Sequence, residues 1–166
     1  RFFLQRFQGV GEVGVYSLAY KFGFIFSSLS VVPFMQAWNP ERFAIVTLPP
    51  AERNQMYDQG FRFLNLILLS VAVALATGSK PFIRIVADPA FHAAASLVPI
   101  IVAAYIFNAW TMVSKFGIDV SERTIFNTYA VWVSVLVILV AYSVLVPPFG
   151  GLGAGLATLL GFLLRF

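Results

Sequence analysis

Long apolar stretches separated by short polar connections dominate the chain. With charged residues and proline–glycine clusters taken as boundaries, the sequence divides into five apolar segments. They cover residues 13–38, 61–78, 93–113, 124–146 and 152–166. The first four have 18 to 26 residues, the length that an α-helix needs to cross a bilayer. Because backbone amides find no partner in lipid, we predict an all-α, polytopic membrane bundle with five transmembrane helices.

Proline and glycine mark the irregular points of these helices. Pro33 and Pro99 lie inside apolar segments and are predicted to kink them, whereas Pro147 and Pro148 are predicted to end the fourth helix. Small residues recur at four-residue spacing in the stretch GGLGAGLATLLG, residues 150–161. This spacing predicts close packing between helices, since small side chains let two backbones approach.

Composition supports the membrane interpretation. Hydrophobic residues make up 60% of the chain and charged residues only 11%, with a mean hydropathy of +0.86. A soluble domain carries about 25% charged residues. The chain has no cysteine, so disulfides and thiolate metal sites are excluded. The eleven basic residues are scattered along the sequence, so no nucleic-acid partner is expected. Membrane lipids are the expected partners.

The basic residues also predict an orientation. Six lie on the side of the connections 39–60 and 114–123: Arg42, Arg53, Arg62, Lys115, Arg123 and Arg165. Four lie on the opposite side: Arg1, Arg6, Lys80 and Arg84. The positive-inside rule therefore places the connections 39–60 and 114–123 in the cytoplasm. The longer connection, 39–60, is expected to contain a short interfacial helix.

The last apolar segment is short for a membrane span. The thirteen residues from Leu152 to Leu164 rise about 20 Å, less than the hydrocarbon thickness of ~30 Å. We therefore expect the chain to be part of a longer membrane protein.

Residues that could support catalysis or cation coupling are sparse. The seven carboxylates all fall in connections or at segment boundaries: Glu12, Glu41, Glu52, Asp58, Asp88, Asp119 and Glu122. No acid is expected at mid-membrane depth, so a proton relay or sodium site is not supported. His92 is the only histidine and is interpreted as interfacial. Without a nucleophile motif, a metal-ligand set or a phosphate loop, we expect no enzymatic activity, no metal and no cofactor.

Lys21 is the exception within the apolar segments. It lies about 12 Å into the first predicted helix, close to the centre of the hydrocarbon. A lysine there costs about 2.5–3.5 kcal/mol on insertion scales, so it should face water or a partner. Helical spacing places Gly14, Ser17, Lys21 and Ser28 on one face. Lys21 either lines an aqueous or ligand-filled cavity, or it snorkels to the nearer interface or pairs with a carboxylate of a helix outside this chain.

Arg62 is a second candidate. Together with Asn65, one turn later, it would place a cation and an amide at the cytoplasmic end of the second helix. The alternative is that Arg62 is a positive-inside anchor. Gln36, Asn108 and Asn127 are interpreted as interhelical hydrogen-bonding residues.

The order of several stretches resembles a known family. RFFL, GEVGVYSLAYKFGFIF and AWNPERF are similar to the second lobe of polysaccharide-unit flippases, the O-antigen and exopolysaccharide transporters of the multidrug/oligosaccharidyl-lipid/polysaccharide superfamily. ADPAFHAAASLVPIIVAAYIF and FGGLGAGLATLLGF resemble that family's proline-bearing and glycine-rich segments. In the family an aspartate usually precedes the arginine that corresponds to Arg1; the sequence starts at Arg1, so this aspartate is either cut away or absent.

The resemblance implies a fold and a function. Residues 1–166 would form part of the second lobe of a transporter of 12–14 helices, without its N-terminal lobe. The protein would flip polyprenyl-diphosphate-linked oligosaccharide across the bacterial inner (cytoplasmic) membrane by alternating access, for surface polysaccharide such as lipopolysaccharide O-antigen or exopolysaccharide. Its partners would be this lipid-linked oligosaccharide and the polysaccharide biosynthesis machinery.

The resemblance also implies a cavity that binds the anionic diphosphate head group. In this chain, that role would fall on Lys21, with Arg62 and Arg1 as further cations. Ser17 and Ser28 would keep the cavity polar, and Tyr16 would stack on sugars unless it packs against lipid.

Three other functions stay open. A multidrug antiporter of the same fold would need an acidic cavity for cationic drugs. A membrane-embedded glycan polymerase or acyltransferase would need catalytic residues in large external loops. A helical scaffold would have no transported ligand.

Overall fold

The apolar segments form long, packed helices. The computed structural model describes residues 2–114 and 124–165, apart from the side chains of residues 124, 126 and 127. These residues form α1 (Phe2–Gln8), α2 (Val10–Phe26), α3 (Val32–Val46), α4 (Pro50–Val86), α5 (Ala94–Ser114) and α7 (Thr124–Arg165). A π-helical turn, Ser27–Val31, joins α2 to α3, and a 3₁₀ turn, Pro89–Phe91, precedes α5. No strand occurs in this described part, so the all-α prediction is confirmed.

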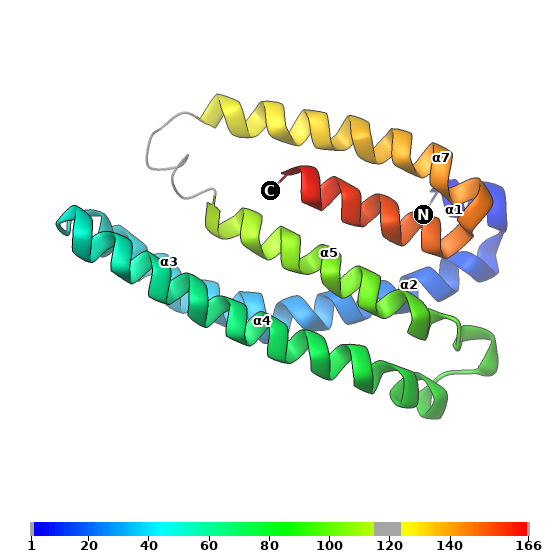
Figure 1. Cartoon of the computed structure of the whole chain (residues 1–166). Coiled ribbons are helices and arrows are strands. Elements are labelled where there is room, and N and C mark those ends of the chain that lie inside the picture. Colours follow the sequence, from blue (N-terminus) through cyan, green and yellow to red (C-terminus); the bar gives the residue numbers. More distant parts are fainter. Residues whose placement is uncertain (1, 115–123, 166) are drawn as a thin grey trace.

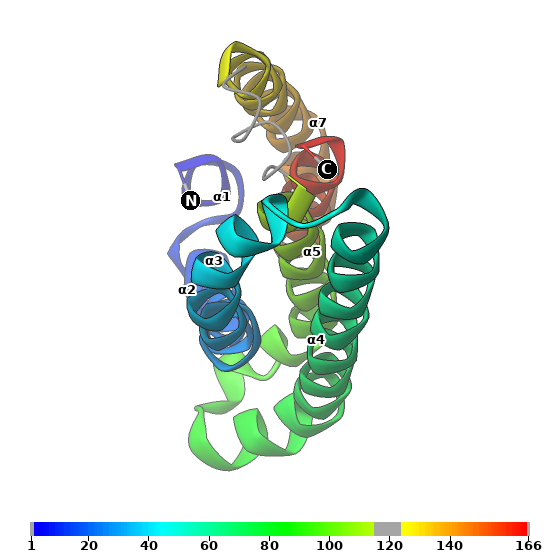
Figure 2. The same cartoon turned by 90° about the vertical axis from the view of Figure 1, so that its left-hand side faces the viewer.

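Four helical stretches are long and apolar enough to cross a membrane. They are Val10–Val46, Pro50–Val86, Pro89–Ser114 and Thr128–Arg165. In Figure 1, α5 lies between α4 and the two halves of α7, and the end view in Figure 2 places α2 and α3 beside them. The described chain is therefore a helical bundle of the membrane class, as its composition predicts.

The first predicted helix is longer than expected, and it contains an irregular turn. Pro33 lacks an N–H and would collide with the carbonyl four residues earlier in a regular helix. The Val32 amide instead hydrogen-bonds to the Ser27 carbonyl, the π-helical pattern that widens the turn before the proline. The helix then continues to Val46, whereas the sequence predicts that it ends after residue 38.

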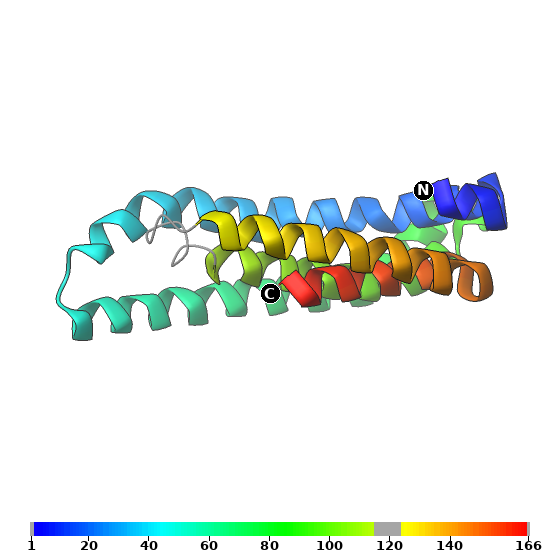
Figure 3. The ribbon, with the colours of Figure 1, turned by 90° about the horizontal axis from the view of Figure 1, so that it is seen from above.

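The 39–60 connection also differs from the prediction. It holds no separate interfacial helix, because its residues extend α3 and α4 on either side of a short turn after Val46. At the other end, α4 continues through Pro81 to Val86, eight residues beyond the predicted end at residue 78. The α3–α4 hairpin consequently projects past the remaining helices, as Figure 3 shows.

The fourth and fifth predicted helices form one element, α7, which folds back on itself at Gly150. Pro147 and Pro148 precede this reversal, and Gly150 adopts φ 54° and ψ −127°, outside the helical region. The predicted close packing of the glycine-rich stretch is confirmed. A side chain at Gly153 would collide with the Leu145 carbonyl, and one at Gly161 with Ile138, so both glycines let the two halves of α7 lie against each other.

Candidate functional site

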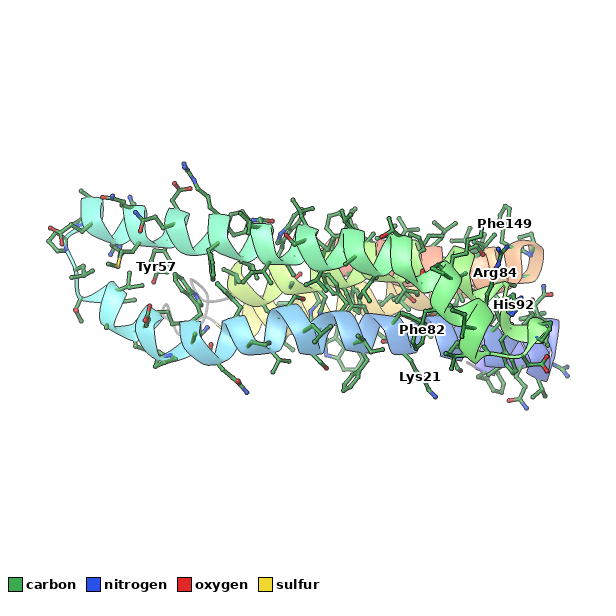
Figure 4. All side chains as sticks on the ribbon, turned by 90° about the horizontal axis from the view of Figure 1, so that it is seen from below. Lys21, Tyr57, Phe82, Arg84, His92 and Phe149 are labelled. Atoms are coloured by element: carbon green, nitrogen blue, oxygen red, sulfur yellow. The ribbon has the colours of Figure 1, made fainter. Side chains whose placement is uncertain are left out.

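Lys21 lies on the outer side of α2, beside the connection that follows α4. A Cβ at Gly23, two residues further on, would lie 2.7 Å from Ile101, near the middle of α5. The backbone near Lys21 therefore packs against α5, whereas the Lys21 side chain borders the connection between α4 and α5. The side chain is exposed and points away from the packed helices in Figure 4.

A shallow pocket surrounds the Lys21 side chain. It has a volume of about 320 Å³ and lies between α2 and the connection that follows α4. Ser17 and Lys21 line it from α2, one turn apart, and Asp88 lines it from the connection. Gly14 also lines the pocket, and the Phe91 ring lies 2.8 Å from the position that a Gly14 Cβ would take, so a larger residue there would crowd the Phe91 ring.

Asp88 was not expected in this pocket. The sequence predicts that no carboxylate accompanies Lys21, and the structure corrects this by folding the residue 87–91 connection back over α2. The Asp88 Oδ1 accepts a hydrogen bond of 3.0 Å from the Ala90 amide and so caps the 3₁₀ turn. Within the described ranges no ion pair joins Lys21 to Asp88, so the ammonium is not neutralised by direct contact. The dipeptide Asp88-Pro89 signals the cap, but nothing local in the sequence signals the proximity to α2.

Ser28 shares the outer side of α2 but not the pocket. It is exposed, two turns beyond Lys21 and within the π-helical turn. Exposed apolar residues surround it, with Phe24 at 68% and Leu29 at 61% of their surface accessible. The polar stripe that helical spacing predicts is therefore divided: Ser17 and Lys21 line the pocket, and Ser28 stands apart.

Tyr16 lies inside the bundle, with 3% of its surface exposed. Its hydroxyl lies 3.3 Å from the Tyr142 hydroxyl and 3.1 Å from Thr158 Oγ1, and the latter two are 2.9 Å apart. Thr158 Oγ1 also donates to the Ala154 carbonyl at 2.9 Å. These bonds tie α2 to both halves of α7, and the buried ring does not reach the Lys21 pocket.

The two predicted arginines lie apart from Lys21. Arg62 is on α4, exposed, and forms an ion pair of 2.8 Å with Asp58 one turn earlier. Such an exposed pair adds little stability, about 0.3–0.5 kcal/mol. Arg1 lies outside the described residues. The neighbouring Asn65 joins helices, since its Oδ1 accepts a 2.8 Å hydrogen bond from the indole of Trp110 on α5.

The groups that line the Lys21 pocket can bind a polar ligand. A flexible ammonium, a hydroxyl and a nearby carboxylate at the edge of a membrane bundle can hold a polar or anionic group by hydrogen bonds and charge. Fold and composition define the class as an α-helical membrane protein. No protein-family model, curated protein or solved structure matched this chain.

Proposed function

We propose that the protein is a flippase that moves polyprenyl-diphosphate-linked oligosaccharide from the cytoplasmic to the outer leaflet of the bacterial inner membrane for surface polysaccharide biosynthesis. The order of family-like sequence stretches supports the substrate class. The polytopic helical bundle supplies the architecture that alternating access requires.

One observation carries the proposal: Lys21 and Ser17 line one exposed pocket beside the connection after α4, and within the described residues no ion pair neutralises the Lys21 ammonium. Its neighbour Gly23 packs at the middle of α5, and the Lys21 side chain points outward. A cation on this face of α2 is stable when the face borders water or an anionic ligand. Ser17 in the same pocket adds a hydroxyl that can bind a phosphate oxygen.

Substitution of Lys21 in the natural protein tests this proposal. Lys21→Ala should lower the export of surface polysaccharide about tenfold to a hundredfold, because a hydrogen bond to a charged group is worth ~1.5–3 kcal/mol. Lys21→Arg should retain most export, since the charge remains. Export is measured per molecule of protein in the membrane.

Lys80→Ala is the matched control. Lys80 is also exposed, but it lies on α4 outside the Lys21 pocket, so its variant should export normally. If Lys21 only snorkels, Lys21→Ala would leave export unchanged at equal protein level, and the proposed role would be wrong.

A further inference from the structure

Two arginines from distant parts of the chain line a second pocket. This pocket lies toward the end of α5 that is opposite to the Lys21 pocket. It has a volume of about 330 Å³, within the range of small-ligand sites. Asn39 and Arg42 line it from α3, Asn108 and Thr111 from α5, and Arg165 from α7.

The polar groups of this pocket suit an anion. The Arg165 Nε atom is buried and has no hydrogen-bond partner among the described residues, and none is recorded there for the Asn108 carboxamide. Among the described residues, no carboxylate lines the pocket. Glu41, although adjacent to Arg42, lines a different pocket between α3 and α4. Two guanidinium groups with carboxamide donors match the oxygens of a phosphate, to which arginine can donate two parallel hydrogen bonds.

The position of the pocket along α5 indicates which kind of molecule would supply the phosphate group. α5 has 21 residues and so rises about 31 Å, close to the hydrocarbon thickness. Thr111 lies seventeen residues, about 26 Å, beyond Ala94 at the start of α5, so the pocket lies near the far side of the ~30 Å hydrocarbon layer, toward the lipid head groups. The Lys21 pocket borders the connection before α5, at the other end of this helix.

We infer that the Arg42–Arg165 pocket binds the phosphate group of a membrane lipid. The assignment depends on the donors and the depth of this pocket alone. It holds whether or not Lys21 takes part in transport.

Lipid binding to the purified natural protein tests this inference. In a neutral detergent, native mass spectrometry should show a bound phosphatidic acid molecule and no equivalent binding of diacylglycerol, which lacks the phosphate. Arg165→Gln should weaken this binding at least about tenfold, the loss expected for one charged hydrogen bond. Arg6→Gln, an exposed arginine on α1, is the control and should bind as the natural protein does.

Asn108→Asp distinguishes a phosphate site from a purely structural cluster. The nearly isosteric carboxylate would pair with the guanidinium groups, so the melting temperature should rise while phosphatidic acid binding falls at least about tenfold. If the folded Arg165→Gln and Asn108→Asp variants bound phosphatidic acid as well as the natural protein does, the proposed phosphate site would be wrong. Complete displacement of the lipid by millimolar inorganic phosphate would overturn the lipid assignment and leave a site for soluble phosphate.

Discussion

Three hydroxyl groups between α2 and α7 show how single residues hold the bundle together. Tyr16 contacts both Tyr142 and Thr158, and the Tyr142–Thr158 hydrogen bond is the shortest of the three contacts, at 2.9 Å. An unpaired buried hydroxyl is costly, so this cluster fixes the rotation of α2 about its own axis against α7. Apolar contacts alone would fix that rotation less sharply.

Tyr16→Phe should lower the free energy of unfolding by about 1 kcal/mol, because Tyr142 and Thr158 remain paired with each other. Thr158→Val should cost more, about 2 kcal/mol, because it leaves the two phenol hydroxyls with only their 3.3 Å contact. Denaturant titration of the protein in detergent micelles measures both. A larger loss from Tyr16→Phe than from Thr158→Val would contradict this reading of the cluster.

Single residues also show the limit of sequence reasoning. The place of Lys21 within an apolar helix could be predicted, because the apolar segment around it is continuous. Asp88 could not be placed beside it, because that requires knowing how the connection after α4 folds over α2. The same holds for Arg42 and Arg165, which only tertiary packing brings to one pocket.

The elements differ from the prediction at their ends. The stretch Gly78-Ser79-Lys80-Pro81 has the composition of a helix end, yet α4 continues through it to Val86. Proline and glycine are tolerated in membrane helices, because lipid offers the backbone no alternative hydrogen-bonding partners. A boundary drawn from residue type alone is therefore too early, and the short helix α1 (Phe2–Gln8) is not predicted, although each apolar segment does form a helix.

The reversal in α7 is held by side chains of the first helices. Gln8 Nε2 donates to the Pro147 carbonyl at 2.8 Å, and Glu12 Oε2 accepts from the Gly151 amide at 3.2 Å. The two side chains thus satisfy backbone groups on either side of Gly150. The Glu12 carboxylate also lies at the N-terminus of the second half of α7, where negative charge is favourable.

Two glycine substitutions test this reversal. Gly150→Ala should lower the free energy of unfolding by about 1–3 kcal/mol, because φ 54° with ψ −127° is strained for any residue with a Cβ. The nearest atoms to a Cβ at Gly150 would lie 3.6 Å away, an ordinary van der Waals distance. The loss of stability would therefore come from backbone strain rather than from a collision. Gly78→Ala is the control: it lies inside α4 with no atom within 4 Å of a new Cβ, and should stabilise by about 0.5–1 kcal/mol. Equal effects of the two variants would exclude backbone strain at Gly150.

At the scale of the whole molecule, two of the spans are too long for the bilayer alone. The stretches Val10–Val46 and Pro50–Val86 each have 37 residues and rise about 55 Å, against a hydrocarbon thickness of ~30 Å. The excess lies largely in the α3–α4 hairpin, which projects beyond the other helices in Figure 3. This hairpin carries Arg42 and Arg53, so the positive-inside rule predicts that its tip lies in the cytoplasm.

Cysteine labelling tests this orientation directly, because the chain has no cysteine of its own. Thr47 at the hairpin tip and Ala90 in the connection before α5 are both exposed, and each can be replaced singly. With an impermeant maleimide on intact cells, Ala90→Cys should react and Thr47→Cys should react only after the membrane is opened. The reverse pattern would place the Arg42–Arg165 pocket in the outer leaflet and Lys21 nearer the cytoplasmic one. A flippase would then first meet its substrate at the Lys21 end of the bundle, so this experiment also fixes the direction in which each pocket is reached.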